Sequence, residues 1–296
     1  MKNPGRIVTA MVTPFDDKGK LSKPRTKKLV TYLVDNFSDS ILVAGTTGES
    51  PTLSDEEKLE LLTWVKEFTP PTYPIIFGAG TNSTAKSIEL GKKAKDTGAD
   101  FLLLVVPYYN KPPQEGIYRH FIEIVESVKL PSIIYNIPSR TGVNLTPETT
   151  LRIAEHKLII GIKEASGSLD AVSAIRAVAK PDFLIYCGDD SLTLPMLSVG
   201  ADGVISVASH LVGRMIKEMI EHYLAGRIME SREIHLELFP LFKGLFYTTN
   251  PIPIKEALSI AGIKVGPVRL PLYENIDARE KLAPILAQYG FLPPGD

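Results

Sequence analysis

Short apolar segments recur along the chain, and stretches with the apolar spacing of an amphipathic helix separate them. Eight such segments span residues 7–15, 41–48, 74–80, 101–109, 131–138, 158–165, 183–190 and 203–209. Their hydrophobicity is nearly continuous rather than alternating, which is typical of parallel strands covered by helices. Successive segments start roughly 20 to 35 residues apart, which is enough for one helical crossover between strands. The pattern therefore predicts eight repeated strand and helix units.

The pattern changes after the eighth segment, where only helical spacing continues. Helices are predicted over residues 211–226, 230–246, 251–262 and 277–290. Eight strands followed by helices favour a closed (β/α)8 TIM barrel, an α/β fold, with a C-terminal helical extension. We expect the barrel to span residues 1–226 and the extension, residues 227–296, to pack on it. A doubly wound open sheet is the main alternative fold.

Two helix starts carry recognisable signals. Ser54 is followed three residues later by Glu57, a capping-box pattern in which each side chain satisfies a backbone N–H of the other residue. Thr146 precedes Pro147, and proline is favoured at the first helical position. These signals predict helices that begin directly after Ser54 and Thr146.

Composition narrows the classes of function. The 296 residues include 33 basic and 34 acidic side chains, for a formal net charge of −1, so nothing favours nucleic acid or a lipid surface as a partner. Cys187 is the single cysteine and the five histidines lack metal-ligand spacing, so we expect neither an internal disulfide nor a metal site. GAGTNS at 78–83 lacks the third glycine of a dinucleotide fingerprint, and no cofactor is expected. No apolar run approaches the ~20 residues of a membrane span, and a cytoplasmic location is expected.

Polar residues gather where the apolar segments end, which is the edge that carries the chemistry in a barrel. Lys163, near the end of the sixth segment, is the strongest candidate among them for a catalytic residue. Its ammonium group would lose hydration there, which favours the neutral amine, and a neutral amine can form a Schiff base with a ketone. The alternative is a structural lysine that reaches solvent at the rim or pairs with Glu164. Strand alternation places Glu164 on the opposite face of the strand, which weakens the alternative in which Lys163 pairs with Glu164.

A Schiff-base enzyme needs a proton donor and acceptor beside the amine. No histidine lies at a strand end before His210, so Tyr135 on the preceding strand is the candidate. Tyrosines near strand ends are also common as plain core or rim residues, and the pattern alone leaves this alternative open. A hydroxyl relay could be completed by Thr46, Thr47, Tyr108 and Tyr109.

Two further features suit a carboxylate ligand. The GTTGES turn at 45–50 can direct backbone N–H groups at an anion, with the hydroxyls of Thr46 and Thr47 as additional donors. Arg140, within PSRTG, has a planar fork that binds both oxygens of a second carboxylate. Glycine-rich turns also occur for steric reasons, and Arg140 could equally form a surface salt bridge.

The motifs, taken in order, resemble those of one family. They are VTPF (12–15), GTTGES, PYYNKP (107–112), YNIPSRTG (135–142), GIKEASG (161–167), GDD (188–190), GVISV (203–207) and NPIPIK (250–255). From about residue 6 to the C-terminus the chain closely resembles the 4-hydroxy-tetrahydrodipicolinate synthases, also called dihydrodipicolinate synthases. This family belongs to the pyruvate-dependent class I aldolase superfamily, which includes N-acetylneuraminate lyase.

The resemblance implies a lyase that condenses pyruvate with L-aspartate 4-semialdehyde in the diaminopimelate route to lysine. It assigns the Schiff base to Lys163 and the proton transfer to Tyr135, with Thr46 and Tyr109 as the proton relay. Tyr109 would reach the active site of a neighbouring subunit, in line with the family's usual homotetramer of two tight dimers. The resemblance also implies that Thr47 binds the pyruvate carboxylate and that the backbone of Ile205 faces bound pyruvate. Arg140 would bind the carboxylate of the semialdehyde.

Arg140 also bears on the alternatives within the superfamily. Sialic-acid lyases usually lack an arginine in this loop, because their second substrate is a sugar aldehyde. A lyase for N-acetylneuraminate or a 2-keto-3-deoxy sugar acid remains a second hypothesis, and a noncatalytic barrel that binds a small keto acid is a third. Fold alone does not decide among them.

Lys86 departs from the pattern of the lysine-inhibited relatives. In those proteins the helix after GAGTN carries a glutamate that holds the amino group of the inhibitor, whereas this chain has Lys86. A positive charge at this position opposes a cationic ligand. We therefore predict weak or absent feedback inhibition by lysine.

Overall fold

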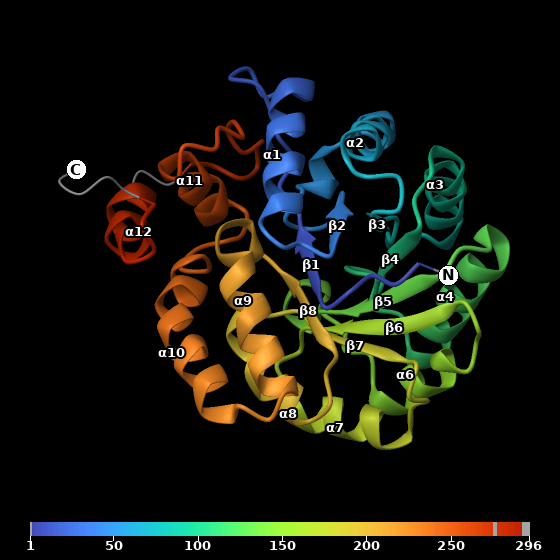
Figure 1. Ribbon diagram of the computed structural model, residues 1–296. Helices are drawn as coiled ribbons and strands as arrows, with labels where there is room; N and C mark the ends of the chain where they lie inside the picture. Colours follow the sequence, from blue (N-terminus) through green and yellow to red (C-terminus); the bar gives the residue numbers. More distant parts are fainter. Residues whose placement is uncertain (1, 275–276, 292–296) are drawn as a thin grey trace. The chain divides into compact units, whose positions relative to one another are not determined.

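The computed structural model describes residues 2–274 and 277–291. Its eight parallel strands follow one another in chain order as a closed barrel (Figure 1), which confirms the predicted TIM-barrel class. The strands are β1 (Ile7–Ala10), β2 (Ser40–Val43), β3 (Ile75–Gly78), β4 (Phe101–Val105), β5 (Ser132–Asn136), β6 (Ile159–Glu164), β7 (Leu184–Cys187) and β8 (Gly203–Ser206). Each predicted apolar segment overlaps one of them.

The strands end earlier than the apolar segments predict. Val12, Ala44 and Val106 follow the last residues of their strands, yet they are only 0%, 2% and 0% exposed. The apolar runs continue because residues that follow a strand are buried as well. The Val12 N–H donates to His210 rather than to a neighbouring strand, whereas the Val106 N–H still donates to the Tyr135 carbonyl of β5 at 2.9 Å. The apolar segments therefore include buried residues beyond the strands.

Helices separate the strands and follow the last one. They are α1 (Lys23–Asp35), α2 (Asp55–Phe68), α3 (Thr84–Thr97), α4 (Gln114–Val128), α5 (Pro138–Thr141), α6 (Pro147–Ala154), α7 (Leu169–Val178), α8 (Thr193–Ser198), α9 (Ser209–Leu224), α10 (Ile228–Gly244), α11 (Ile252–Ile260) and α12 (Ala278–Ala287), with short 3₁₀ turns η1 (Ser50–Thr52) and η2 (Asp190–Leu192). Within the described residues, the elements after β8 are all helices, which confirms the C-terminal helical extension. A boundary at residues 226 and 227 would fall between α9 and α10, and it stays a prediction. No helix in the described part of the chain is long and apolar enough to cross a membrane.

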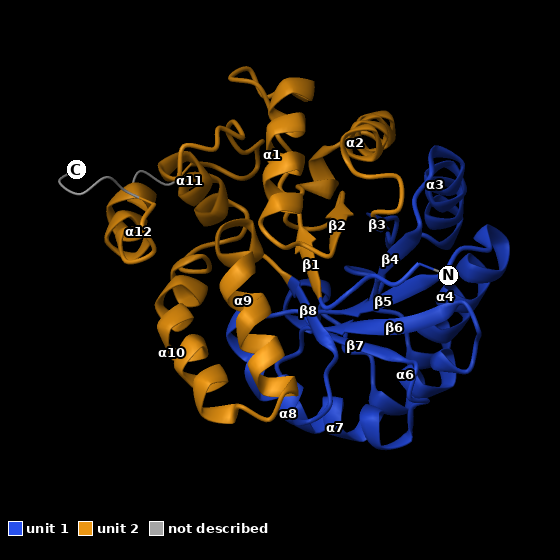
Figure 2. Cartoon of the chain, viewed as in Figure 1, with its two compact units in different colours: residues 1–6, 74–205 blue, residues 7–73, 206–296 orange. Residues whose placement is uncertain are grey.

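Two compact units make up the chain (Figure 2). Unit 1 comprises residues 1–6 and 74–205, and unit 2 comprises residues 7–73 and 206–296. The strands β3 to β7 and most of β8 belong to unit 1, together with α3 to α8. Unit 2 contains β1, β2, α1, α2 and the helices from α9 onward. Unit 2 therefore combines the start of the barrel with the C-terminal helices, which are distant in sequence.

Strand pairing within unit 1 determines which side chains are neighbours. β5 and β6 pair with Tyr135 opposite Lys163 and with Asn136 opposite Glu164. Consecutive residues of a strand point to opposite faces. Tyr135 and Lys163 therefore share one face of the sheet, and Asn136 and Glu164 share the other.

Both predicted helix starts are confirmed. In unit 2 the Ser54 hydroxyl accepts a hydrogen bond from the Glu57 N–H at 3.2 Å, and the Ser54 N–H donates to the Glu57 carboxylate at 3.0 Å. In unit 1 the Thr146 hydroxyl accepts from the Thr149 N–H at 3.3 Å, and Pro147 is the first residue of α6. These caps satisfy backbone N–H groups that a helix cannot pair internally.

Candidate active site

The seven site residues predicted from the sequence divide between the two units. Unit 1 contains Lys163, Tyr135, Tyr109, Arg140 and Ile205, and unit 2 contains Thr46 and Thr47. Ile205 lies on β8 and is 1% exposed.

Lys163 and Tyr135 are side by side in unit 1. Lys163 Nζ lies 4.3 Å from the centre of the Tyr135 ring, and the two residues are 7% and 5% exposed. Among the described residues, no hydrogen bond or ion pair engages Lys163 Nζ, whereas the buried amines of Lys58 and Lys255 each have a carboxylate partner. A sequestered amine that no carboxylate holds is suited to nucleophilic attack. The structure therefore brings the predicted nucleophile and proton-transfer residue together.

Gly188, directly after β7, makes room for the Lys163 side chain. A Cβ atom at this position would lie 2.6 Å from the Ala165 Cβ and 3.1 Å from Lys163 Cε. Both distances are shorter than normal van der Waals contacts, so a larger residue would displace the lysine stem. The absence of a side chain at Gly188 is thus part of the site geometry.

Glu164 does not pair with Lys163, so the version in which this carboxylate holds the ammonium group is wrong. Glu164 is 1% exposed and accepts hydrogen bonds from Asn136 Nδ2 at 3.0 Å and from the Ser166 N–H at 2.6 Å. Burial raises the pKa of Glu164, and the hydrogen bonds from Asn136 and Ser166 oppose that rise. Glu164, the sequence neighbour of Lys163, is therefore a buried anchor that ties the end of β5 to the segment after β6.

The loop after β5 carries Arg140 and is closed at its base by Asn136. Asn136 Oδ1 accepts from the Leu145 N–H at 3.0 Å, and Asn136 Nδ2 donates to Asn144 Oδ1 at 2.8 Å. Arg140 lies within α5, where it is exposed. An exposed guanidinium on a loop with a fixed base can meet an incoming carboxylate without a large loss of loop entropy.

Tyr109 is 88% exposed, so its side chain makes little contact within its own chain. Its φ of 74° is in the left-handed region, and its N–H donates to the Thr141 carbonyl at 3.3 Å. The structure does not bring this ring together with Lys163 and Tyr135. Its backbone is instead tied to the Arg140 loop.

The Thr46–Thr47 turn in unit 2 is held from two directions. Asn250 Nδ2 donates to Thr47 Oγ1 at 2.9 Å, and the Thr13 hydroxyl donates to the Gly48 carbonyl at 2.5 Å. Thr47 is 3% exposed, while Thr46 is half-buried. Because the Thr47 oxygen accepts the amide hydrogen, its own proton is directed to another acceptor. This arrangement suits a carboxylate ligand.

The sequence alone predicted no role for three of these supporting residues. Gly188, Thr13 and Asn250 belong to the motifs GDD, VTPF and NPIPIK, and that membership was the only signal of their importance. Their partners are Lys163, Gly48 and Thr47, which are 25, 35 and 203 positions away.

His210, a fully buried histidine of unit 2, has a structural role. His210 Nε2 accepts from the Val12 N–H at 3.1 Å, and His210 Nδ1 donates to the Val207 carbonyl at 2.8 Å. Burial lowers the pKa of His210 to about 4. Because both ring nitrogens have backbone partners, His210 is a neutral packing residue rather than a general base.

Residues 3–289 match the dihydrodipicolinate synthetase family. The chain belongs to this family. A 4-hydroxy-tetrahydrodipicolinate synthase from Moorella thermoacetica is 53% identical over 289 residues, which cover 97% of this chain and 99% of that protein. The crystal structure of DHDPS from Cyanidioschyzon merolae with lysine bound is 47% identical, with a TM-score of 0.96 and coverage of 98% and 99% of the two chains. A chloride-inhibited dihydrodipicolinate synthase from Acinetobacter baumannii, complexed with pyruvate, is 38% identical, with a TM-score of 0.94 and coverage of 98% and 100%.

Membership of the dihydrodipicolinate synthetase family confirms the relationship predicted from the motifs. The relatives are named as synthases, so the predicted class, a lyase of the class I aldolase type, is confirmed as well. Within this family member, Lys86 lies in the first turn of α3 and is exposed. Its effect on lysine binding stays a prediction.

Proposed function

We propose that the chain condenses pyruvate with L-aspartate 4-semialdehyde through a Schiff base on Lys163, in the diaminopimelate route to lysine. The observation that carries this proposal is the buried Lys163 amine, 4.3 Å from the Tyr135 ring centre, in a chain of this family. Several near full-length relatives carry the name 4-hydroxy-tetrahydrodipicolinate synthase, which supports the choice of substrates.

The first half of the reaction forms an enamine. The neutral Lys163 amine attacks the ketone carbon of pyruvate, a proton reaches the ketone oxygen, and water leaves to give the imine. Removal of a methyl proton then gives the enamine. Tyr135 is the proposed donor and acceptor of these protons, and Thr46 and Tyr109 are the proposed relay to solvent.

The second half joins the two substrates. The enamine carbon attacks the aldehyde of the semialdehyde, whose carboxylate Arg140 binds in this proposal. The amino group of the same substrate then attacks the imine carbon and displaces Lys163, which closes the ring. One water is released overall, in the formation of the first imine. Thr47 and the backbone of Ile205 are the proposed contacts to the pyruvate unit.

We also propose that the chain assembles as a homotetramer of two tight dimers. Support comes from Tyr109, whose 88% exposed side chain has little to contact within its own chain and would serve a neighbouring subunit. Analytical ultracentrifugation would measure the assembly directly. We further propose that residues 1–226 form the barrel and residues 227–296 the extension. The proposed location of the protein is the cytoplasm.

Borohydride trapping followed by peptide mass spectrometry tests the proposed chemistry. Incubation with pyruvate and borohydride should add one reduced pyruvyl group to the peptide that contains Lys163. Absence of that adduct would overturn the proposal, and reversible pyruvate binding without adduct would favour the noncatalytic barrel. Turnover of N-acetylneuraminate or a 2-keto-3-deoxy sugar acid in preference to the semialdehyde would favour the second enzyme hypothesis.

A further inference from the structure

Glu49 is a buried carboxylate two residues beyond Thr47. It is 2% exposed and its φ of 56° lies in the left-handed region, which is uncommon for a residue with a side chain. Oε1 lies 2.5 Å from Lys255 Nζ, and Oε2 accepts from the Arg269 N–H at 2.8 Å. Two distant segments of unit 2 therefore converge on this single side chain.

Lys255 reaches Glu49 from α11 and is itself buried, with 4% of its side chain exposed. Its Nζ also donates to the Pro267 carbonyl at 2.8 Å and lies 4.3 Å from the centre of the Phe15 ring. Burial lowers the pKa of Lys255 to about 8, and the Glu49 charge opposes that shift. A buried ion pair of this kind is costly to form, and removal of one partner leaves the other charge uncompensated.

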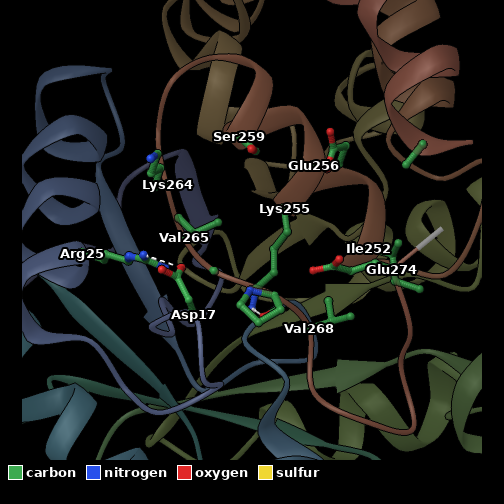
Figure 3. A pocket seen from close by; sticks show the side chains of 13 residues that line it. Asp17, Arg25, Ile252, Lys255, Glu256, Ser259, Lys264, Val265, Val268 and Glu274 are labelled. Atoms are coloured by element: carbon green, nitrogen blue, oxygen red, sulfur yellow. Dashed lines mark hydrogen bonds and ion pairs between the residues drawn. The ribbon is translucent and has the colours of Figure 1, made fainter. Parts of the chain in front are cut away.

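A cavity of about 550 Å³ in unit 2 lies beside this lysine. Figure 3 shows the Lys255 side chain extending from its helix along the cavity, with charged side chains of both signs around it. Asp17 and Arg25 among them are paired with each other at 2.6 Å. The mixed charge of these side chains identifies no class of ligand for the cavity. The open space beside Lys255 means that an uncharged side chain of similar length can replace this lysine without overpacking.

The segment from residue 250 to 255 thus contacts the threonine turn twice. Asn250 donates to Thr47, and Lys255 holds Glu49. We propose that the Glu49–Lys255 ion pair is a positioning device that sets the turn in the conformation in which Thr47 receives the carboxylate of the keto acid. This inference rests on the function proposed above.

The physical reason lies in the charge of Glu49. A buried carboxylate two residues from an anion-binding hydroxyl repels the substrate unless its charge is compensated. Lys255 provides this compensation and also fixes the carboxylate, and through it the strained backbone of the turn. Loss of Lys255 should therefore weaken binding of the keto acid more than it slows the chemistry on Lys163.

Kinetics of Lys255→Met, Glu49→Gln and the double variant test this inference. Lys255→Met should raise KM for pyruvate at least about tenfold with kcat within about threefold of the wild type, the pattern expected when a binding interaction is lost. KM for the semialdehyde should stay unchanged, and borohydride should still label Lys163 at saturating pyruvate. The double variant should recover part of the KM loss, because it removes the uncompensated carboxylate as well.

Lys58→Met is the matched control. Lys58 is a second buried lysine of unit 2, 8% exposed and paired with Asp55 at 3.0 Å, but its partner lies on the same helix and not in the threonine turn. The control should keep the wild-type KM for pyruvate. Equal pyruvate KM values in Lys255→Met and Lys58→Met would overturn the inference. A decrease in the kcat of Lys255→Met that matches its loss of folded protein, with KM unchanged, would overturn it as well.

Glu49→Gln decides the matter if Lys255→Met does not fold. The amide keeps an acceptor for the Arg269 N–H but loses the ion pair, and a KM for pyruvate equal to that of the wild type would contradict the inference. Trapping in the wild-type protein separates the two proposals. No adduct on Lys163 refutes the proposed function, whereas a normal adduct with unchanged KM in the variants refutes only the positioning role.

Discussion

Lys163 Nζ lies over the ring of Tyr135, 4.3 Å from its centre, because the two residues are opposite each other in the parallel pairing of β6 with β5. The aromatic ring forms an apolar wall for the amine, and its hydroxyl is the proposed proton donor and acceptor. The contact has two separable parts, the ring and the hydroxyl.

Tyr135→Phe separates these parts, because it keeps the ring and removes the hydroxyl. We expect the rate of Schiff-base formation to fall by about 10²- to 10⁴-fold, the usual contribution of a positioned general acid or base. Quenched-flow borohydride trapping measures this rate, and circular dichroism checks the fold. A rate within about threefold of the wild type would show that proton transfer does not depend on Tyr135.

Arg140→Ala should weaken recognition of the second substrate. Loss of a charge-assisted contact of about 1.5 to 3 kcal/mol predicts a rise of about ten- to 150-fold in KM for the semialdehyde, with KM for pyruvate unchanged. Arg140→Lys should be intermediate, because lysine keeps the charge but not the planar fork. A coupled assay with the downstream reductase gives both constants, and an equal rise for the two substrates would contradict the assignment.

Glu164→Ala should destabilise the protein and loosen the Arg140 loop. The change leaves Asn136 Nδ2 and the Ser166 N–H without their carboxylate acceptor, at a cost of about 1 to 3 kcal/mol for each buried group. Urea unfolding should therefore give a lower free energy of unfolding, and KM for the semialdehyde should rise. Glu164→Gln keeps an oxygen acceptor and should cost less, so equal losses in the two variants would argue against this anchoring role.

Lysine should inhibit the wild-type protein weakly because of the charge of Lys86. Lys86→Glu should increase the sensitivity to lysine about tenfold or more, whereas Lys86→Met should have a smaller effect, since it removes repulsion without supplying attraction. Steady-state inhibition assays at fixed pyruvate and semialdehyde concentrations measure this difference. Strong inhibition of the wild type at submillimolar lysine would refute the prediction.

His210 should make the stability depend on pH. Its pKa in the folded chain is about 4, below the value of 6.5 expected for an exposed histidine, so the unfolded chain binds the proton first as the pH falls. The free energy of unfolding should therefore decrease below about pH 6.5, by about 2 kcal/mol at about pH 5, and this loss should level off below about pH 4.

His210→Gln should lack that part of the pH dependence, although its stability at neutral pH is expected to be lower. Urea unfolding at about pH 7.5 and about pH 5, at one fixed protein concentration, compares the two proteins. The same loss of stability in both would mean that another group is responsible.

Local sequence determined the class of fold and made Lys163 a candidate for the central chemistry. Continuous apolar runs indicated all eight strands, and the position of Lys163 near the end of one of them suggested the nucleophile, a role that stays a proposal. The apolar runs did not locate the strand ends, because burial in a loop and burial in a strand produce the same apolar pattern, as at Val12.

Only the tertiary structure decided what surrounds the reactive groups. Asn250 contacts Thr47 across 203 positions, and Lys255 holds Glu49 across a similar separation. Periodicity reports which face of an element is buried, because that depends on neighbours a few residues away. It carries no information on which distant side chain meets that face, because this depends on strand register and on the packing of helices far apart in the chain.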